Sequence, residues 1–260
     1  MNTALIAGRG LLPVEIARRL DEPLILSLGG DEELSRYAGK LVELSTPSLG
    51  RAIKLMKSYS CDSVIMAGLI PKRLMYSVGV LFDRTNRKVL KKTLRDDHSL
   101  LGSIVSELEA NGIKVLPYWE ILPDFLASTG KLSTRQPTER EINDVNYGRE
   151  ILRVTLPCSF GQSVCVADGS VSAIESMEGT DATIARAGEI CGRGVVVKMM
   201  KPSQDMRYDL PTVGTSTLET MKRAGLTCLA VEAGKTLILE PEKFFALSEK
   251  YKIAVWGIAS

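Results

Sequence analysis

The stretch "TALIAGRGLLPVEIARRLDEPLILSLG", Thr3 to Gly29, holds an apolar run, a helical pattern and a second apolar run. We interpret it as strand, helix and strand, with Gly8 and Gly10 in the turn that follows the first strand. Strands separated by helical segments of about a dozen residues are typical of βαβ units, whose strands are parallel. This stretch therefore predicts an α/β fold.

The same alternation continues through the first half of the chain. Helical patterns over 49–60 and 99–112 are each followed by an apolar run, at 63–68 and 114–118. The second helical pattern ends in Asn and Gly, the usual helix stop. We expect a Rossmann-like N-terminal domain with a parallel sheet over residues 1–131.

The second half has a different pattern and predicts a distinct α/β (α+β) domain over 141–260. A polar linker over 132–140 leads into a helix that starts with Thr138 and Glu141 at the spacing of a capping box. In "SVCVADGSVSAIES" the pair Asp168-Gly169 indicates a tight β-hairpin. Strand and helix patterns then alternate from 194 to 251.

Composition excludes several classes of protein. The 260 residues are 45% hydrophobic and 25% charged with a net charge of +2, which favours a soluble globular protein and gives no case for nucleic-acid binding. No apolar run approaches the roughly 20 residues that span a bilayer, and no basic segment precedes the apolar N-terminus, so we expect a cytoplasmic protein. The sequence carries no signal for an oligomeric state.

Catalysis, if present, depends on carboxylates. The five cysteines form no CxxC pair, and His98 is the one histidine, which argues against zinc sites and catalytic triads. His98 follows Asp96 and Asp97 at the expected start of a helix, and we interpret this group as capping.

The segment "KPSQDMRYDLPTVG", 201–214, is the main candidate site. Its prolines exclude one regular helix or a central strand, and it holds two carboxylates, Asp205 and Asp209. Carboxylates together with phosphate oxygens and water are the ligands that Mg²⁺ prefers, and Lys201 and Arg207 can neutralise a phosphoryl group. A solvated loop with local ion pairs is the alternative.

Two further segments are candidates for phosphate contact. Glu178, Gly179, Thr180 and Asp181 surround an expected helix start, with Thr180 as N-cap, and ordinary capping is the alternative. The glycine turn after the first strand also suits a phosphate, but Pro13 replaces the third glycine of the dinucleotide fingerprint. The turn by itself suggests a nicotinamide-dependent oxidoreductase, but the incomplete fingerprint makes this function the weaker alternative.

The segment 71–92 mixes apolar and basic residues. It predicts an amphipathic face that lies either in solvent or against acyl chains at a membrane surface.

Taken together, the motifs resemble one family over nearly the whole chain. "IAGRGLLP", "GQSVCVADGSVSAIESMEGTDA", "VVKMMKPSQDMRYDLPTVG" and "AGLTCLAVEAGKTLIL" are similar to the LpxI-type UDP-2,3-diacylglucosamine pyrophosphatases. The resemblance implies a cytoplasmic, Mg²⁺-dependent hydrolase of lipid A biosynthesis with substrate held between two domains. Its substrate would be a nucleotide-linked diacylated glucosamine, split by water into 2,3-diacylglucosamine 1-phosphate (lipid X) and UMP, with peripheral membrane contact possible.

The resemblance also implies roles for residues. Asp209, and after it Asp205, would be the catalytic and metal-binding carboxylates. The remaining residues would bind substrate: Gly8, Arg9, Gly10, Leu11, Glu178, Gly179, Thr180, Asp181, Lys201, Gln204, Arg207 and Thr212. The family shows a run of glycines where this chain has Arg9, a side chain that can itself meet a phosphate. A non-catalytic lipid- or nucleotide-binding protein is the other alternative.

Overall fold

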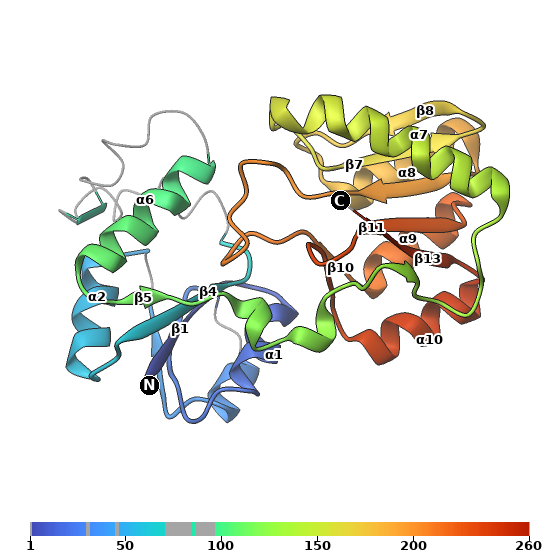
Figure 1. Ribbon diagram of the computed structural model, residues 1–260. Coiled ribbons are helices and arrows are strands. Elements are labelled where there is room, and N and C mark those ends of the chain that lie inside the picture. The colour runs from blue at the N-terminus through green and yellow to red at the C-terminus, as the bar shows by residue number, and fades with distance from the viewer. Residues whose placement is uncertain (1, 30–31, 45–46, 71–84, 87–96, 260) are drawn as a thin grey trace. The chain divides into compact units, whose positions relative to one another are not determined.

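A computed structural model describes residues 2–29, 32–44, 47–70, 85–86 and 97–259 (Figure 1). The chain forms two compact units, Met1–Leu122 and Pro123–Ser260. The expected boundary at residue 131 and the expected linker over 132–140 lie within the second unit. The cause is backbone pairing, since Leu132 N donates to Val255 O at 3.0 Å and Val255 N donates to Ser133 Oγ at 2.7 Å.

The first unit is the predicted Rossmann-like half. Its elements are β1 (Thr3–Ala7), α1 (Leu11–Ala17), β2 (Leu24–Ser27), β3 (Lys40–Glu43), α2 (Leu49–Ser58), β4 (Ser63–Ala67), α6 (Asp97–Ala110) and β5 (Lys114–Val115), with a 3₁₀ turn at Glu32–Arg36. Among the described residues the strand pairs of this unit are parallel, in the order β3-β2-β1-β4-β5. Strands β1, β2 and β4 are largely buried, as their apolar runs predict, whereas edge strand β3 has no buried residue and was not predicted.

The second unit contains more strands than the sequence predicted. Its elements are β6 (Gly130–Lys131), α7 (Glu139–Thr155), β7 (Ser163–Ala167), β8 (Ser170–Ile174), α8 (Thr180–Cys191), β9 (Val195–Lys198), β10 (Thr212–Val213), α9 (Thr215–Ala224), β11 (Cys228–Glu232), β12 (Leu237–Ile238), α10 (Pro241–Tyr251) and β13 (Ala254–Ile258), with 3₁₀ turns at Tyr118–Glu120 before it and at Pro123–Phe125 and Leu156–Cys158 within it. The main sheet runs β6-β13-β11-β9-β7-β8. Strands β9, β11 and β13 are parallel, and β7 and β6 add to them in the antiparallel direction.

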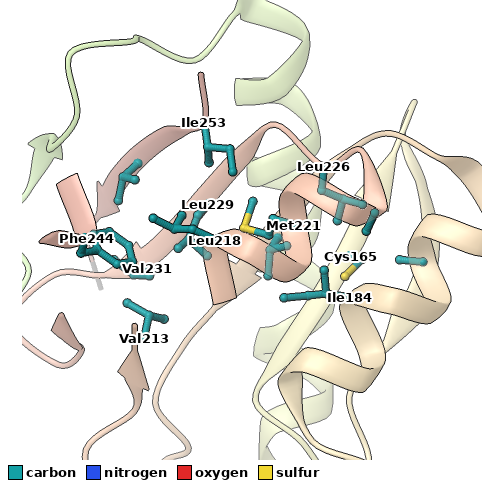
Figure 2. Packing of buried hydrophobic residues seen from close by; sticks show 14 of the residues in the cluster. Cys165, Ile184, Val213, Leu218, Met221, Leu226, Leu229, Val231, Phe244 and Ile253 are labelled. Carbon is teal, nitrogen blue, oxygen red and sulfur yellow. The ribbon is translucent and has the colours of Figure 1, made fainter. Parts of the chain in front are cut away.

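Helices cover both faces of this sheet, so its central strands are buried throughout. Val195 and Val197 of β9 pack with α7, whereas Val196 between them packs with α8 and α9. Figure 2 shows the second of these cores, with Leu229 of β11 close to Leu218 of α9. This two-sided burial explains the uninterrupted apolar runs of these strands.

The predicted hairpin and capping box are both confirmed. Asp168 and Gly169 join β7 to β8 with φ values of 53° and 71°, the conformation of a tight two-residue turn. Thr138 Oγ1 accepts from Glu141 N at 3.2 Å, and a Glu141 carboxylate oxygen accepts from Thr138 N at 2.7 Å. Glu141 is buried, and it also accepts from Arg135 and Thr227.

Replacing Thr138 with alanine should lower the free energy of unfolding by about 1 kcal/mol, because it removes the N-cap acceptor of α7. Urea unfolding followed by circular dichroism measures this change. Thr155→Ala is the matched control at the other end of α7, where the hydroxyl only donates to Ile151 O of its own helix. Equal effects of the two substitutions would show that the cap contributes nothing.

Two predictions lie outside the described residues. These are the amphipathic segment over 71–92, apart from residues 85–86, and the capping role of Asp96, Asp97 and His98, because the structure describes Asp97 and His98 only by their backbone in α6. Within the part of the chain that the structure describes, no helix is long and apolar enough to cross a membrane.

Candidate functional site

Four strands of the second unit end at one edge of its sheet. Because β7 is antiparallel to both β8 and β9, and β9, β11 and β13 are parallel, the ends of β8, β9, β11 and β13 lie on the same side. Helices α8 and α9 begin at this edge, and the segment 199–211, which we call the acidic loop, follows β9 there. The carboxyl edge of an open α/β sheet is where such folds bind ligands.

Asp205 forms a two-pronged ion pair within the acidic loop. Arg207 Nη2 donates to Asp205 Oδ2 at 2.7 Å, and Arg207 Nε lies 3.1 Å from both carboxylate oxygens. Hydrogen bonding from Arg207 holds the pKa of Asp205 below its usual value. The Arg207 guanidinium also lies 5.9 Å from the ring centre of Tyr208. This ion pair between two residues of the acidic loop therefore stabilises the conformation of the loop.

The other predicted residues of the acidic loop are held by its backbone. Asp209 N donates to Asp205 O at 3.0 Å, and the side chain of Asp209 is half-buried. Gln204 Oε1 accepts from Lys201 N at 2.8 Å, so this amide closes the first turn of the loop. Lys201 Nζ donates to Ser159 O at 3.3 Å, which connects the loop to the segment before β7.

The start of α8 differs in detail from its prediction. Gly179, with φ 84°, is the N-cap, and Thr180 is the first helical residue, so Thr180 as N-cap was wrong. A glycine takes this left-handed conformation without strain. Glu178 pairs with Arg186 at 2.5 Å, which lowers the pKa of Glu178, and Asp181 is exposed. Gly179 has no side chain that could cap α8, and Thr183 Oγ1 in the first turn of this helix donates to Glu178 Oε1 at 3.2 Å.

A buried lysine that the sequence analysis missed connects the two segments. Lys198, only 5% exposed, donates to Thr180 Oγ1 at 3.1 Å and to Thr212 O at 2.9 Å. Thr180 Oγ1 in turn donates to Glu175 Oε1 at 3.0 Å, and Glu175 Oε2 accepts from Gln162 N at 3.2 Å. Burial lowers the pKa of Lys198, against the opposing influence of Glu175 and Asp181.

We call Lys198, Thr180, Glu175 and Thr212 the lysine network. One signal in the sequence points to it: Lys198 ends an apolar strand run directly before the acidic loop. A second buried carboxylate, Glu232 at the end of β11, accepts from Met200 N at 2.8 Å and pairs with Lys235. The first residues of the acidic loop are thus fixed to the end of β11 and, through the 3.0 Å hydrogen bond from Met199 N to Gln162 O, to the residue before β7.

The glycine turn belongs to the first unit. Gly8 N donates to Ala67 O at 2.8 Å, and Arg9 exchanges two hydrogen bonds of 2.9 Å with Leu69. A side chain at Gly8 would collide with the backbone of Gly68 at 2.7 Å. The amides of Gly8 and Arg9 are therefore engaged with the chain itself, whereas the Arg9 side chain and Leu11 are exposed.

The donor set of the acidic loop suits a magnesium ion that takes most of its ligands from substrate and water. Among the described residues no group of three or more His, Cys, Asp or Glu side chains can hold a metal. Mg²⁺ needs no such cage, since one or two carboxylates with phosphate oxygens and waters suffice. Within the acidic loop the two carboxylates available for such an ion are Asp205, which faces the Arg207 guanidinium with both oxygens, and Asp209.

Comparison with known proteins accounts for both units. Residues 2–125 match the profile of the LpxI N-terminal domain, and residues 128–256 match that of the LpxI C-terminal domain. The chain is also 30% identical, over 98% of its length and 96% of the relative's, to a protein of Caulobacter vibrioides named UDP-2,3-diacylglucosamine pyrophosphatase LpxI. The chain therefore belongs to the LpxI family.

Proposed function

We propose that the protein hydrolyses the diphosphate of UDP-2,3-diacylglucosamine. Water attacks the α-phosphorus, the bond from this phosphorus to the bridging oxygen breaks, and that oxygen leaves with the β-phosphate. The products are UMP and 2,3-diacylglucosamine 1-phosphate, known as lipid X. The observation that carries this proposal is the similarity, along nearly the entire chain, to a relative named for this substrate and reaction.

The carboxyl edge of the second sheet supports the proposal chemically. A diphosphate resists attack because its negative charge repels nucleophiles, so a catalyst has to supply positive charge and an aligned water. Lys201 and Arg207 provide positive charge on the acidic loop, and the first backbone N–H groups of α8, which Gly179 does not cap with a side chain, would act as donors. We assign diphosphate contact to these groups, and to Gln204 and Thr212 beside them.

Asp209 is the residue that we assign to hold a magnesium ion and to orient the water. When bound, the ion would supply positive charge against the phosphate oxygens. Asp205 has a different role in this proposal, because its ion pair fixes Arg207 in place for the phosphate. The substrate joins a nucleotide to two acyl chains, so we further infer that the protein works in the cytoplasm at a membrane surface.

Hydrolysis in ¹⁸O-labelled water tests the reaction directly. We expect the label in UMP, because the attacked phosphorus stays with the nucleoside, and no label in the lipid product. Chelation with EDTA should lower the rate by at least about 100-fold, and added Mg²⁺ should restore it. Mass spectrometry of both products gives the position of the label.

Three outcomes would contradict parts of this assignment. Label in the sugar phosphate would place the attack on the other phosphorus. Full activity in EDTA would show that the reaction requires no metal ion. Absence of UMP from every metal-supplemented reaction would disprove the proposed function.

A further inference from the structure

The lysine network contains a buried positive charge whose partner is a hydroxyl instead of a carboxylate. Lys198 Nζ contacts Thr180 Oγ1 and Thr212 O, and over the described residues no carboxylate lies within 4.0 Å of it. Charge compensation comes through Thr180, whose own hydroxyl donates to the buried Glu175. Such an arrangement is costly to bury and holds only when each member stays in place.

The two acceptors of Lys198 belong to the two segments that carry the candidate site. Thr180 is the first residue of α8, directly after Glu178 and Gly179. Thr212 is the first residue of β10, directly after the acidic loop and three residues after Asp209. One ammonium group therefore fixes the distance between the start of a helix and the end of the loop.

We propose that Lys198 is a positioning residue for diphosphate hydrolysis at this edge. Its hydrogen bonds to Thr180 and Thr212 hold the start of α8 and the end of the acidic loop at a fixed separation. The phosphate-binding groups of both segments can therefore contact the same substrate. This inference rests on the proposed function for its kinetic test. Misplacing catalytic groups by about 1 Å costs about 100-fold in rate.

Lys198→Met removes the donors and the charge while keeping a flexible chain of similar length. We expect kcat for UMP release to fall by about 100-fold, with KM changed by less than about three-fold because Lys198 acts through other residues. Lys198→Arg keeps a charged donor and should recover about ten-fold of that loss. Lys222→Met, an exposed lysine on α9, is the matched control and should behave as the parent protein.

The double variant Lys198→Met with Glu175→Gln separates positioning from folding. It removes both buried charges, so the thermal midpoint should lie close to that of the parent while kcat stays about 100-fold low. A folded double variant with parental kcat would overturn the proposal. Loss of kcat that only follows loss of the thermal midpoint in both variants would overturn it as well.

Hydrogen exchange keeps the inference testable if the parent protein releases no UMP. In that case the proposed function fails, and the connection made by Lys198 is judged on its own. Lys198→Met should speed amide exchange at both 176–183 and 209–213, because the two segments lose their common anchor. Unchanged exchange at either segment would overturn the inference.

Discussion

Asp209→Asn is expected to lower kcat for UMP release by about 1,000-fold, equal to about 4 kcal/mol of transition-state stabilisation. Asparagine keeps the size of the side chain and one oxygen but loses the negative charge. A neutral oxygen holds Mg²⁺ weakly and cannot orient an attacking water as a carboxylate does. Asp205→Asn should cost less, about ten-fold, because it loosens Arg207 without removing this charge.

Steady-state release of UMP at saturating Mg²⁺ measures both substitutions. Glu219→Gln on the exposed side of α9 is the matched control for the loss of one carboxylate, and it should retain parental kcat. Circular dichroism shows whether each variant is folded. A folded Asp209→Asn protein with parental kcat would remove Asp209 from the mechanism, and a larger loss at Asp205 than at Asp209 would exchange their roles.

Gly161→Ala is expected to destabilise the second unit by about 3 kcal/mol and to lower activity with it. A methyl group at this position would lie 1.9 Å from Glu175 O and 2.6 Å from Glu175 C, both backbone atoms. Relief requires a shift of the chain that carries the Glu175 carboxylate away from Gln162 and Thr180. The Glu175 carboxylate of the lysine network would then no longer lie where it accepts the hydrogen bond from the Thr180 hydroxyl.

Urea unfolding of the whole chain, followed by intrinsic fluorescence and circular dichroism, gives the change in stability. Gly214→Ala is the matched control, because its added methyl group would meet only Leu239 Cβ, at an ordinary 3.8 Å. We expect that control to change the free energy of unfolding by less than about 0.5 kcal/mol. Equal stability of the two variants would show that the 159–162 segment moves aside without cost.

The elements that were predicted correctly are those whose pattern is local. Buried strands such as β1 and β9 have uninterrupted apolar runs, and the Asp168-Gly169 turn has one backbone requirement that few other pairs meet. Strand β3 escaped prediction because none of its four residues is buried, and β6 because only two residues pair. The assignment of 130–131 to the second compact unit depends on the pairing of β6 with β13, more than 100 residues later in the sequence, which no local pattern reveals.

The sequence predicted which loop carries the candidate site, but it did not predict the side-chain contacts that hold this loop in place. Prolines and alternating charges single out the acidic loop, whereas the pairing of Asp205 with Arg207 depends on loop conformation. Lys198 was missed because a single lysine at the end of a strand usually reaches solvent. Its burial results from α8 and β10 meeting above β9, which is a property of the tertiary structure.

The position of β13 has a consequence for biosynthesis. The sheet of the first unit is complete once Val115 has left the ribosome, so this half can fold while translation continues. In the second unit, β13 inserts between β11 and β6, and both of these strands keep an unpaired edge until Ile258 emerges. Nascent chains therefore expose open β-edges in this half for most of its synthesis, and chaperones that shield such edges will matter most there.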